Sequence, residues 1–110
     1  MRAIVVGAKG RMGAHVLNAL EGVGIECVAK VDGFYDETKN NEYKSLSEVN
    51  VEADVLIDFS FHLLIKDICE YVAKTGIATV IATTGHTSEE KQMIYDLATK
   101  APVFYSGNYS

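Results

Sequence analysis

Three glycines near the start of the chain have the spacing of a phosphate-binding turn. In the run Ile4-Val5-Val6-Gly7-Ala8-Lys9-Gly10-Arg11-Met12-Gly13, an apolar segment passes through a turn into a helical pattern. Gly7 lets the chain turn sharply, Gly10 leaves room for a pyrophosphate against backbone N–H groups, and Gly13 lets the helix lie close to the strands. The helix would direct its free amides and positive dipole end at the anion. The run predicts nucleotide binding, with a purely structural glycine turn as the alternative.

A carboxylate farther along the chain favours a dinucleotide. Asp32 follows the second apolar run, 19 positions after Gly13, close to the ~20 expected for the group that accepts hydrogen bonds from the adenosine ribose. Lys9 stands where the usual fingerprint has its second glycine, and it flanks the turn together with Arg11. Basic residues at a helix start are unfavourable unless an anion is present, and these two can offset the repulsion between Asp32 and the extra phosphate of NADPH. The predicted cofactor is therefore NADH or NADPH, with the preference left open.

Two further polar segments follow apolar runs and belong to the same edge of a parallel sheet. Ala82-Thr83-Thr84-Gly85 offers hydroxyls and amides to a ribose or a nicotinamide carboxamide, or else only shapes a turn. Ser106-Gly107-Asn108-Tyr109 offers an amide that both donates and accepts and a ring that can stack, or else is a frayed end. Both segments are expected on the ligand side of the sheet, and the residues alone leave open whether they contact the cofactor or have only a structural role.

The remaining polar candidates have structural interpretations. Asp58 is expected to be a turn carboxylate and Ser60 the N-cap of a helix, with a cofactor contact at this segment as the alternative. His62 is expected at the surface, and His86 is expected to be a solvated loop histidine without a catalytic role. The three histidines of the chain are scattered singly, so no metal site is predicted. Cys27 and Cys69 form no C-x-x-C pair and are interpreted as packed free thiols.

Alternating strand and helix patterns must position these groups. Short apolar runs predict parallel strands covered on both faces, at Ala3–Val6, Cys27–Val31, Val55–Ile57, Ala78–Ala82 and Val103–Tyr105. Helical periodicity predicts helices over Arg11–Gly22, from a Ser60 cap through a stripe of Phe61, Leu64, Ile65, Ile68 and Val72 to Gly76, and from a Thr87/Glu90 capping box to Ala101-Pro102. The polar segment Gly33–Ala53 is predicted to be a surface excursion in which Tyr43–Leu46 forms a short edge strand or a turn.

The predicted fold class is therefore α/β: an incomplete, Rossmann-like doubly wound parallel sheet of about five strands and three helices. The length of 110 residues predicts a single domain over residues 1–110. The chain has 48% hydrophobic residues and a net charge of −5, which disfavours a nucleic-acid partner. Its apolar stretches are too short to cross a membrane and its start too short for a signal peptide, so a cytoplasmic protein is expected.

Four blocks, in their order and spacing, resemble a known family. Gly7-Ala8-Lys9-Gly10-Arg11-Met12-Gly13, Ile57-Asp58-Phe59-Ser60, Ala82-Thr83-Thr84-Gly85 and Asn108-Tyr109-Ser110 resemble the amino-terminal half of dihydrodipicolinate reductase, an enzyme of bacterial lysine and diaminopimelate biosynthesis. The resemblance covers essentially the whole chain. It implies an oxidoreductase that transfers hydride from NADH or NADPH to the C=N bond of a cyclic dicarboxylate imine. The cofactor contacts that it implies are Gly7, Ala8, Lys9, Gly10, Arg11, Met12, Asp32, Ala82, Thr83, Thr84, Ser106, Gly107, Asn108 and Tyr109.

The chain departs from the family pattern at single positions and in length. The family often has glycine where Lys9 and Ala82 stand, phenylalanine where Tyr109 stands, and a proline soon after the Asp58-Phe59-Ser60 block. In the family, the chain continues into a substrate-binding domain that forms a homotetramer and carries histidine-rich and lysine motifs. Nothing here matches those motifs, so no catalytic residue is transferred, and we expect a cofactor-binding part that is inactive alone.

Three alternative functions remain at this point. A non-catalytic module that senses NADH would share the glycine turn and Asp32. Another Rossmann dehydrogenase would share them too and would differ in its substrate domain. The third alternative is an assembly piece that associates through an open sheet edge after Tyr105.

Overall fold

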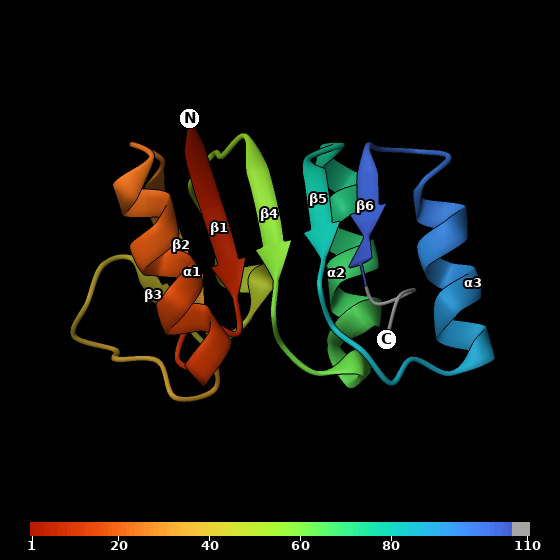
Figure 1. The fold of residues 1–110 in the computed structure, drawn as a ribbon, viewed down its shortest axis with the longest axis horizontal. Coiled ribbons are helices and arrows are strands. Elements are labelled where there is room, and N and C mark those ends of the chain that lie inside the picture. Colours follow the sequence, from red (N-terminus) through yellow and green to blue (C-terminus); the bar gives the residue numbers. More distant parts are fainter. Residues whose placement is uncertain (107–110) are drawn as a thin grey trace.

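Six parallel strands form one sheet in the computed structural model, which describes residues 1–106 (Figure 1). The strands are β1 (Arg2–Val6), β2 (Glu26–Val31), β3 (Glu42–Tyr43), β4 (Val55–Asp58), β5 (Ala78–Ile81) and β6 (Val103–Tyr105). Their order in the sheet is β3-β2-β1-β4-β5-β6, and every neighbouring pair is parallel. The chain thus winds outward in both directions from β1. The predicted doubly wound, Rossmann-like α/β fold is confirmed.

The five longer strands match the prediction, and a sixth lies where the sequence left a short edge strand or a turn open. The additional strand is β3, at the edge of the sheet, where Lys30 and Val31 pair with Glu42 and Tyr43. It begins one residue before the segment for which a short edge strand or a turn was expected, and Leu46–Glu48 form the 3-10 turn η1 instead. So short an edge strand leaves little periodicity in the sequence, because only two residues join the ladder.

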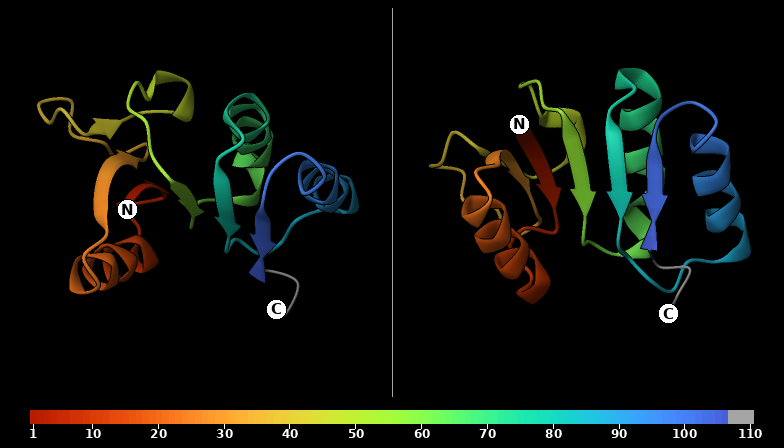
Figure 2. Two further views of the ribbon diagram at one scale, coloured as in Figure 1. Left: turned by 90° about the horizontal axis from the view of Figure 1, so that it is seen from above. Right: turned by 45° about the horizontal axis from the view of Figure 1, so that its top comes forward.

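The helices lie on both faces of the sheet, which explains the apolar strands. Helix α1 (Arg11–Gly22) covers one face, and α2 (Ile65–Thr75) and α3 (Ser88–Leu97) cover the other (Figure 2). Ala3 and Val5 of β1 pack in the cluster beneath α1, whereas Ile4 and Val6 pack in the cluster on the opposite face. All four are buried, so no alternation of polar and apolar residues appears in this strand.

The start of α2 differs from the expectation. The 3-10 turn η2 (His62–Leu64) precedes the helix, and Ser60 is not its N-cap. The amide and the hydroxyl of Ser60 both donate to the Asp58 carboxylate, which holds Ser60 at the end of β4. Phe61 is consequently 77% exposed instead of forming part of the buried stripe. The predicted helix stop is confirmed, because Gly76 is left-handed at φ 70°.

The capping box of α3 is present as predicted. The Glu90 amide donates to Thr87 Oγ1 over 3.1 Å, and the Thr87 amide donates to Glu90 Oε1 over 2.8 Å. Cys27 and Cys69 are free and half-buried. None of the helices among residues 1–106 has the length and apolar character needed to span a membrane.

Two of the three spaced glycines are required by close backbone contacts. A Cβ at Gly7 would lie 2.7 Å from the carbonyl carbon of Phe59, and its φ of +84° is unfavourable for other residues. A Cβ at Gly13 would lie 2.3 Å from the carbonyl oxygen of Gly7. A Cβ at Gly10 would meet only the Gly7 carbonyl oxygen, at 3.4 Å, so the fold itself tolerates a side chain there.

Gly13→Ala is expected to lower the free energy of unfolding by about 1–3 kcal/mol, because the methyl group pushes α1 away from the end of β1. Gly22→Ala, also in α1, is the matched control. Its Cβ would meet nothing within 4 Å, so stability should stay the same or rise by less than about 1 kcal/mol. Thermal and urea denaturation measure both variants, and equal stability of Gly13→Ala and Gly22→Ala would contradict the close-contact role.

Candidate functional site

A cavity of ≈ 330 Å³ lies at the carboxyl ends of β1, β2 and β4. Strand β1 adjoins both β2 and β4, and the chain order reverses there. Open parallel sheets bind their ligands at this kind of switch point. The lining residues come from the turn after β1, the loop after β2, the segment after β4 and one lysine: Val6, Gly7, Gly10, Arg11, Met12, Val31, Asp32, Gly33, Lys44, Phe59, Ser60, Phe61 and Leu64.

The amino-terminal end of α1 lies in the wall of this cavity and is not capped by a side chain. Gly10 is the N-cap and provides no side-chain acceptor, and the first turn of α1 carries no acidic residue. The first amides of a helix have no intrahelical partner. The Gly10 amide donates to the Gly7 carbonyl, so the donors beside the cavity are the amides of Arg11 and Met12, at a positive dipole end that can hold an anion.

Asp32 lines the cavity on the side of β2. Its Oδ2 accepts a hydrogen bond from the Lys9 amide over 3.0 Å, and its Oδ1 accepts one from the Phe34 amide over 2.9 Å. These bonds fix the carboxylate between the glycine turn and the loop after β2. A carboxylate held there can accept hydrogen bonds from the hydroxyls of a ribose.

The Lys9 side chain forms an ion pair within the chain. Its Nζ lies 2.8 Å from Glu42 Oε1, so the ammonium group is directed at β3. The pair raises the pKa of Lys9 and lowers that of Glu42. Glu42 also accepts a hydrogen bond from the Asp36 amide. Lys9 and Ala8 do not line the cavity, whereas Arg11 does.

The hydroxyl of Thr83 faces the protein interior. Thr83 is buried, and its Oγ1 lies 2.6 Å from His86 Nε2 and donates to Asp58 Oδ2 over 3.4 Å. Thr84, the next residue in this loop, is exposed. At the next strand, the Ser106 hydroxyl donates to the Ile81 carbonyl.

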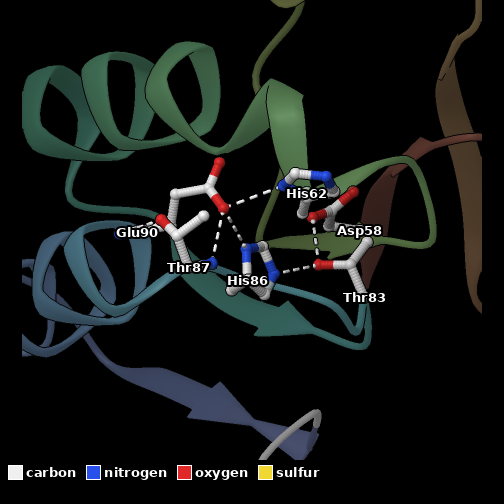
Figure 3. Close-up of polar contacts among 6 residues, drawn as sticks. All are labelled: Asp58, His62, Thr83, His86, Thr87 and Glu90. Atoms are coloured by element: carbon white, nitrogen blue, oxygen red, sulfur yellow. Dashed lines mark hydrogen bonds and ion pairs between the residues drawn. The ribbon is translucent and has the colours of Figure 1, made fainter.

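His86 is buried, and the expectation of a solvated histidine is wrong. Its side chain is enclosed by the rings of His62 and Tyr105, with centroid distances of 6.1 and 5.7 Å. Burial lowers the pKa of His86. Its Nδ1 has no hydrogen-bond partner and lies 4.0 Å from Glu90 Oε1, the atom that His62 Nδ1 contacts at 2.8 Å (Figure 3).

Asp58 is completely buried at the end of β4. Its burial raises the pKa of the carboxyl group, and the hydrogen bonds from Ser60 and Thr83 oppose this effect. The predicted turn role is confirmed, because Asp58 holds Ser60. Within residues 1–106, no group of three or more histidine, cysteine and acidic side chains is arranged to hold a metal ion.

The structure brings part of the predicted site together. Gly7, Gly10, Arg11, Met12 and Asp32 line one cavity. Ala82–Thr84 and Ser106 follow β5 and β6 at the same edge of the sheet, outside that cavity (Figure 1). Gly107, Asn108 and Tyr109 lie outside the described residues.

Sequence reasoning missed several contributors. It did not include the cavity residues Lys44, Phe59, Phe61 and Leu64, and it assigned Ser60 mainly to a cap. The segment after β4 carried a usable signal, because it follows a strand whose carboxyl end adjoins the glycine turn. The four-residue spacing between His86 and Glu90 was a signal as well, since α3 begins between them.

Comparison with known proteins identifies relatives of the chain. The family model described as "Dihydrodipicolinate reductase, N-terminus" matches residues 1–109. A 4-hydroxy-tetrahydrodipicolinate reductase of Sulfurovum is 39% identical over 96% of this chain, and one of Caldanaerobacter subterraneus is 40% identical over 100%. The chain spans 44% of the length of each of these relatives. Among solved structures, the dipicolinate-bound dihydrodipicolinate reductase of Paenisporosarcina matches with a TM-score of 0.71 and 22% identity, over 89% of this chain and 43% of that one.

The opposite pKa shifts of Asp58 and His86 predict opposite effects of pH on stability. The pKa of Asp58 is raised, so its contribution to stability is lost as pH rises above the ordinary value of 3.8. The pKa of His86 is lowered, so its contribution is lost as pH falls below the ordinary value of 6.5.

Asp58→Asn should therefore remove the loss of folding stability that Asp58 causes as pH rises. His86→Gln should remove the loss of folding stability that His86 causes as pH falls. The measurement is the free energy of unfolding against pH for each variant minus that of the wild type. His15→Gln, at an exposed position of α1, is the control. Difference curves with the reverse signs, or flat curves for both variants, would contradict the assignment.

Proposed function

The chain belongs to the dihydrodipicolinate reductase family, in which it corresponds to the amino-terminal, NAD(P)H-binding domain, and we propose that it serves hydride transfer to the C=N bond of a cyclic dicarboxylate imine. This reaction would belong to lysine and diaminopimelate biosynthesis. The ligand named for the solved Paenisporosarcina relative, dipicolinate, is a planar ring with two carboxylates and supports this substrate class.

One observation carries the cofactor part of the proposal. The uncapped end of α1 lies in the wall of the switch-point cavity, beside the fixed carboxylate of Asp32. The amides of Arg11 and Met12 would hold the pyrophosphate, and Asp32 would accept from the adenosine ribose. A dinucleotide extended along the carboxyl edge would then direct its nicotinamide toward Ala82–Thr84 and the segment after β6.

The contribution of these residues to the chemistry is positioning. When bound, the dihydronicotinamide supplies the hydride, and the protein places its C4 against the acceptor carbon. The substrate carboxylates require cationic partners. In the proposed division of labour these come from the substrate domain of the family, and residues 1–110 bind the coenzyme without reducing the imine. In this proposal the homotetramer likewise belongs to the complete reductase.

Gly10→Ala tests the proposed pyrophosphate site without disturbing the fold. The new methyl group fits the structure, with its nearest neighbour at 3.4 Å, but it occupies the surface against which the phosphates must lie. We expect the affinity for NADH, followed by nicotinamide fluorescence, to fall by about tenfold or more, which corresponds to roughly 1.4 kcal/mol. The protein should stay folded, with a loss of stability of no more than about 1 kcal/mol, because alanine is a poorer N-cap than glycine. Gly22→Ala should bind like the wild type, and full affinity in Gly10→Ala would refute the site.

The ion pair between Lys9 and Glu42 predicts how the coenzyme preference can be changed. If Lys9 turns from Glu42 to the 2′-phosphate of NADPH, Lys9→Ala should weaken NADPH by about 1 kcal/mol more than NADH, as expected for one charge-assisted contact. Glu42→Gln should have the opposite effect and favour NADPH, because it frees the ammonium group. Calorimetric titration with both coenzymes measures the ratio. An unchanged ratio in both variants would exclude this role for Lys9.

A further inference from the structure

A chain of polar side chains runs behind the loop after β5. It consists of Asp58 at the end of β4, Thr83 and His86 in the loop, and Glu90 in the first turn of α3, and we call it the Asp58–Glu90 chain (Figure 3). Asp58, Thr83 and His86 are buried, and Glu90 is held by the Thr87 amide and by His62. The Ala82 amide also donates to the Asp58 carbonyl. The loop is therefore tied on its inner side to β4 and α3.

When Asp58 is ionised and the His86 imidazole is neutral, the polar hydrogen atoms of these side chains are too few to serve Asp58, Thr83 and both imidazole nitrogens. Thr83 has one hydroxyl proton and two neighbours that can accept it, Asp58 Oδ2 and His86 Nε2. If Asp58 is ionised and takes that proton, His86 must donate from Nε2, and its bare Nδ1 faces the Glu90 carboxylate at 4.0 Å. If the imidazole proton is on Nδ1 instead, Thr83 donates to Nε2 and Asp58 Oδ2 loses its donor.

One added proton removes this conflict. A protonated Asp58 can donate to Thr83 Oγ1, Thr83 then donates to His86 Nε2, and His86 Nδ1–H faces Glu90. A second arrangement has the same number of protons. In it, Asp58 gives its proton to Thr83 and Thr83 gives its own proton to His86 Nε2, so Asp58 is ionised and His86 is an imidazolium. Burial raises the pKa of Asp58 and lowers that of His86, which favours the first arrangement.

We propose that His86 is a positioning residue for the nicotinamide end of the cofactor, and that it holds the loop of residues 82–85 through the Asp58–Glu90 chain, which is complete only with one added proton. This inference rests on the proposed function, in which Ala82–Thr84 contact the nicotinamide half. His86 does not touch the ligand in this arrangement. It acts through the Thr83 hydroxyl, which faces inward and leaves the exposed Thr84 and the loop amides on the ligand side.

The groups around His86 determine the direction of the pH effect. Besides Asp58 behind Thr83, the facing groups are Glu90 and Lys91 from α3, His62 from η2 and Tyr105 from β6. The Glu90 carboxylate favours a proton on Nδ1, whereas Lys91 and His62 disfavour a positive charge on the imidazole. The added proton is therefore best placed on Asp58. As pH rises and this proton is lost, the two hydrogen bonds of Thr83 reverse direction and His86 Nδ1 faces the Glu90 carboxylate without a proton, so the loop is held less firmly.

The test compares a whole and a truncated ligand across pH. Over the pH range in which the protein stays folded, wild-type affinity for NADH should fall roughly fivefold with rising pH, the effect of about one polar contact. ADP-ribose lacks the nicotinamide and should bind with the same affinity throughout. Thermal denaturation at each pH verifies that the protein is folded.

Asp58→Asn is the sharpest variant, because its amide reproduces the hydrogen bonds of a protonated Asp58. Its oxygen can accept from Ser60 and its NH₂ can donate to Thr83. NADH affinity should stay near the low-pH wild-type value at every pH. His86→Ala should weaken NADH about fivefold or more and leave ADP-ribose unchanged. His86→Gln, which can still bond Thr83, should restore most of the affinity without the pH dependence, and His15→Gln is the control.

The outcomes separate the two proposals. If NADH binding is independent of pH in the wild type, or if ADP-ribose is affected as strongly as NADH by His86→Ala, His86 is not a positioning residue, and the proposed function stands. If neither NADH nor ADP-ribose binds to folded wild-type protein at any pH, the proposed function fails, and this inference fails with it. If His86→Ala does not fold, the pH profiles of Asp58→Asn and His86→Gln decide.

Discussion

The candidate site depends on a close backbone contact between the start of α1 and the end of β1. Gly13 lies so near the turn that a Cβ there would meet the carbonyl oxygens of Gly7 and Ala8 at 2.3 and 2.7 Å. This contact brings the first turn of the helix directly over the end of the strand. It thereby places the unpaired helix amides in the wall of the cavity between β2 and β4. Any residue other than glycine at position 13 would move the amides as well as the helix.

The amino termini of α1 and α3 differ in whether the chain's own side chains satisfy the first backbone amides. The amino terminus of α3 is satisfied internally by the capping box of Thr87 and Glu90, with a second acidic residue, Glu89, in the first turn. The amino terminus of α1 has a glycine in place of the cap and no acidic residue. The positive end of α3 is therefore neutralised by its own side chains, whereas that of α1 is available to an anion. Glu90 additionally contacts His62 and faces His86, so the cap of α3 also belongs to the buried polar chain.

Local patterns in the sequence predicted the fold well, and long-range contacts account for the errors. Apolar runs and capping signals identified the longer strands and all three helices because these features act within a few residues. The start of α2 was wrong because the Asp58 carboxylate competes for the Ser60 amide and hydroxyl. His86 was expected in solvent because nothing within its own turn indicates the rings of His62 and Tyr105, 24 and 19 positions away, that enclose it. Likewise, the partner of Lys9 is Glu42, in a segment interpreted as a polar excursion.

The turn at the end of β4 connects the two halves of the carboxyl edge. The Phe59–Ser60 peptide packs against Gly7, where a Cβ would lie 2.7 and 2.8 Å from its carbonyl carbon and amide nitrogen, and both residues line the switch-point cavity. The side chain of Asp58 reaches in the other direction, to Ser60 and to Thr83 in the loop after β5. A change in the ionisation of this one buried carboxyl group therefore acts on the loop of Thr83, whereas the Phe59–Ser60 wall of the cavity is also held by its backbone contact with Gly7. A ligand that spans both regions would experience this coupling, whereas a ligand confined to the cavity would meet only the part held by backbone contacts.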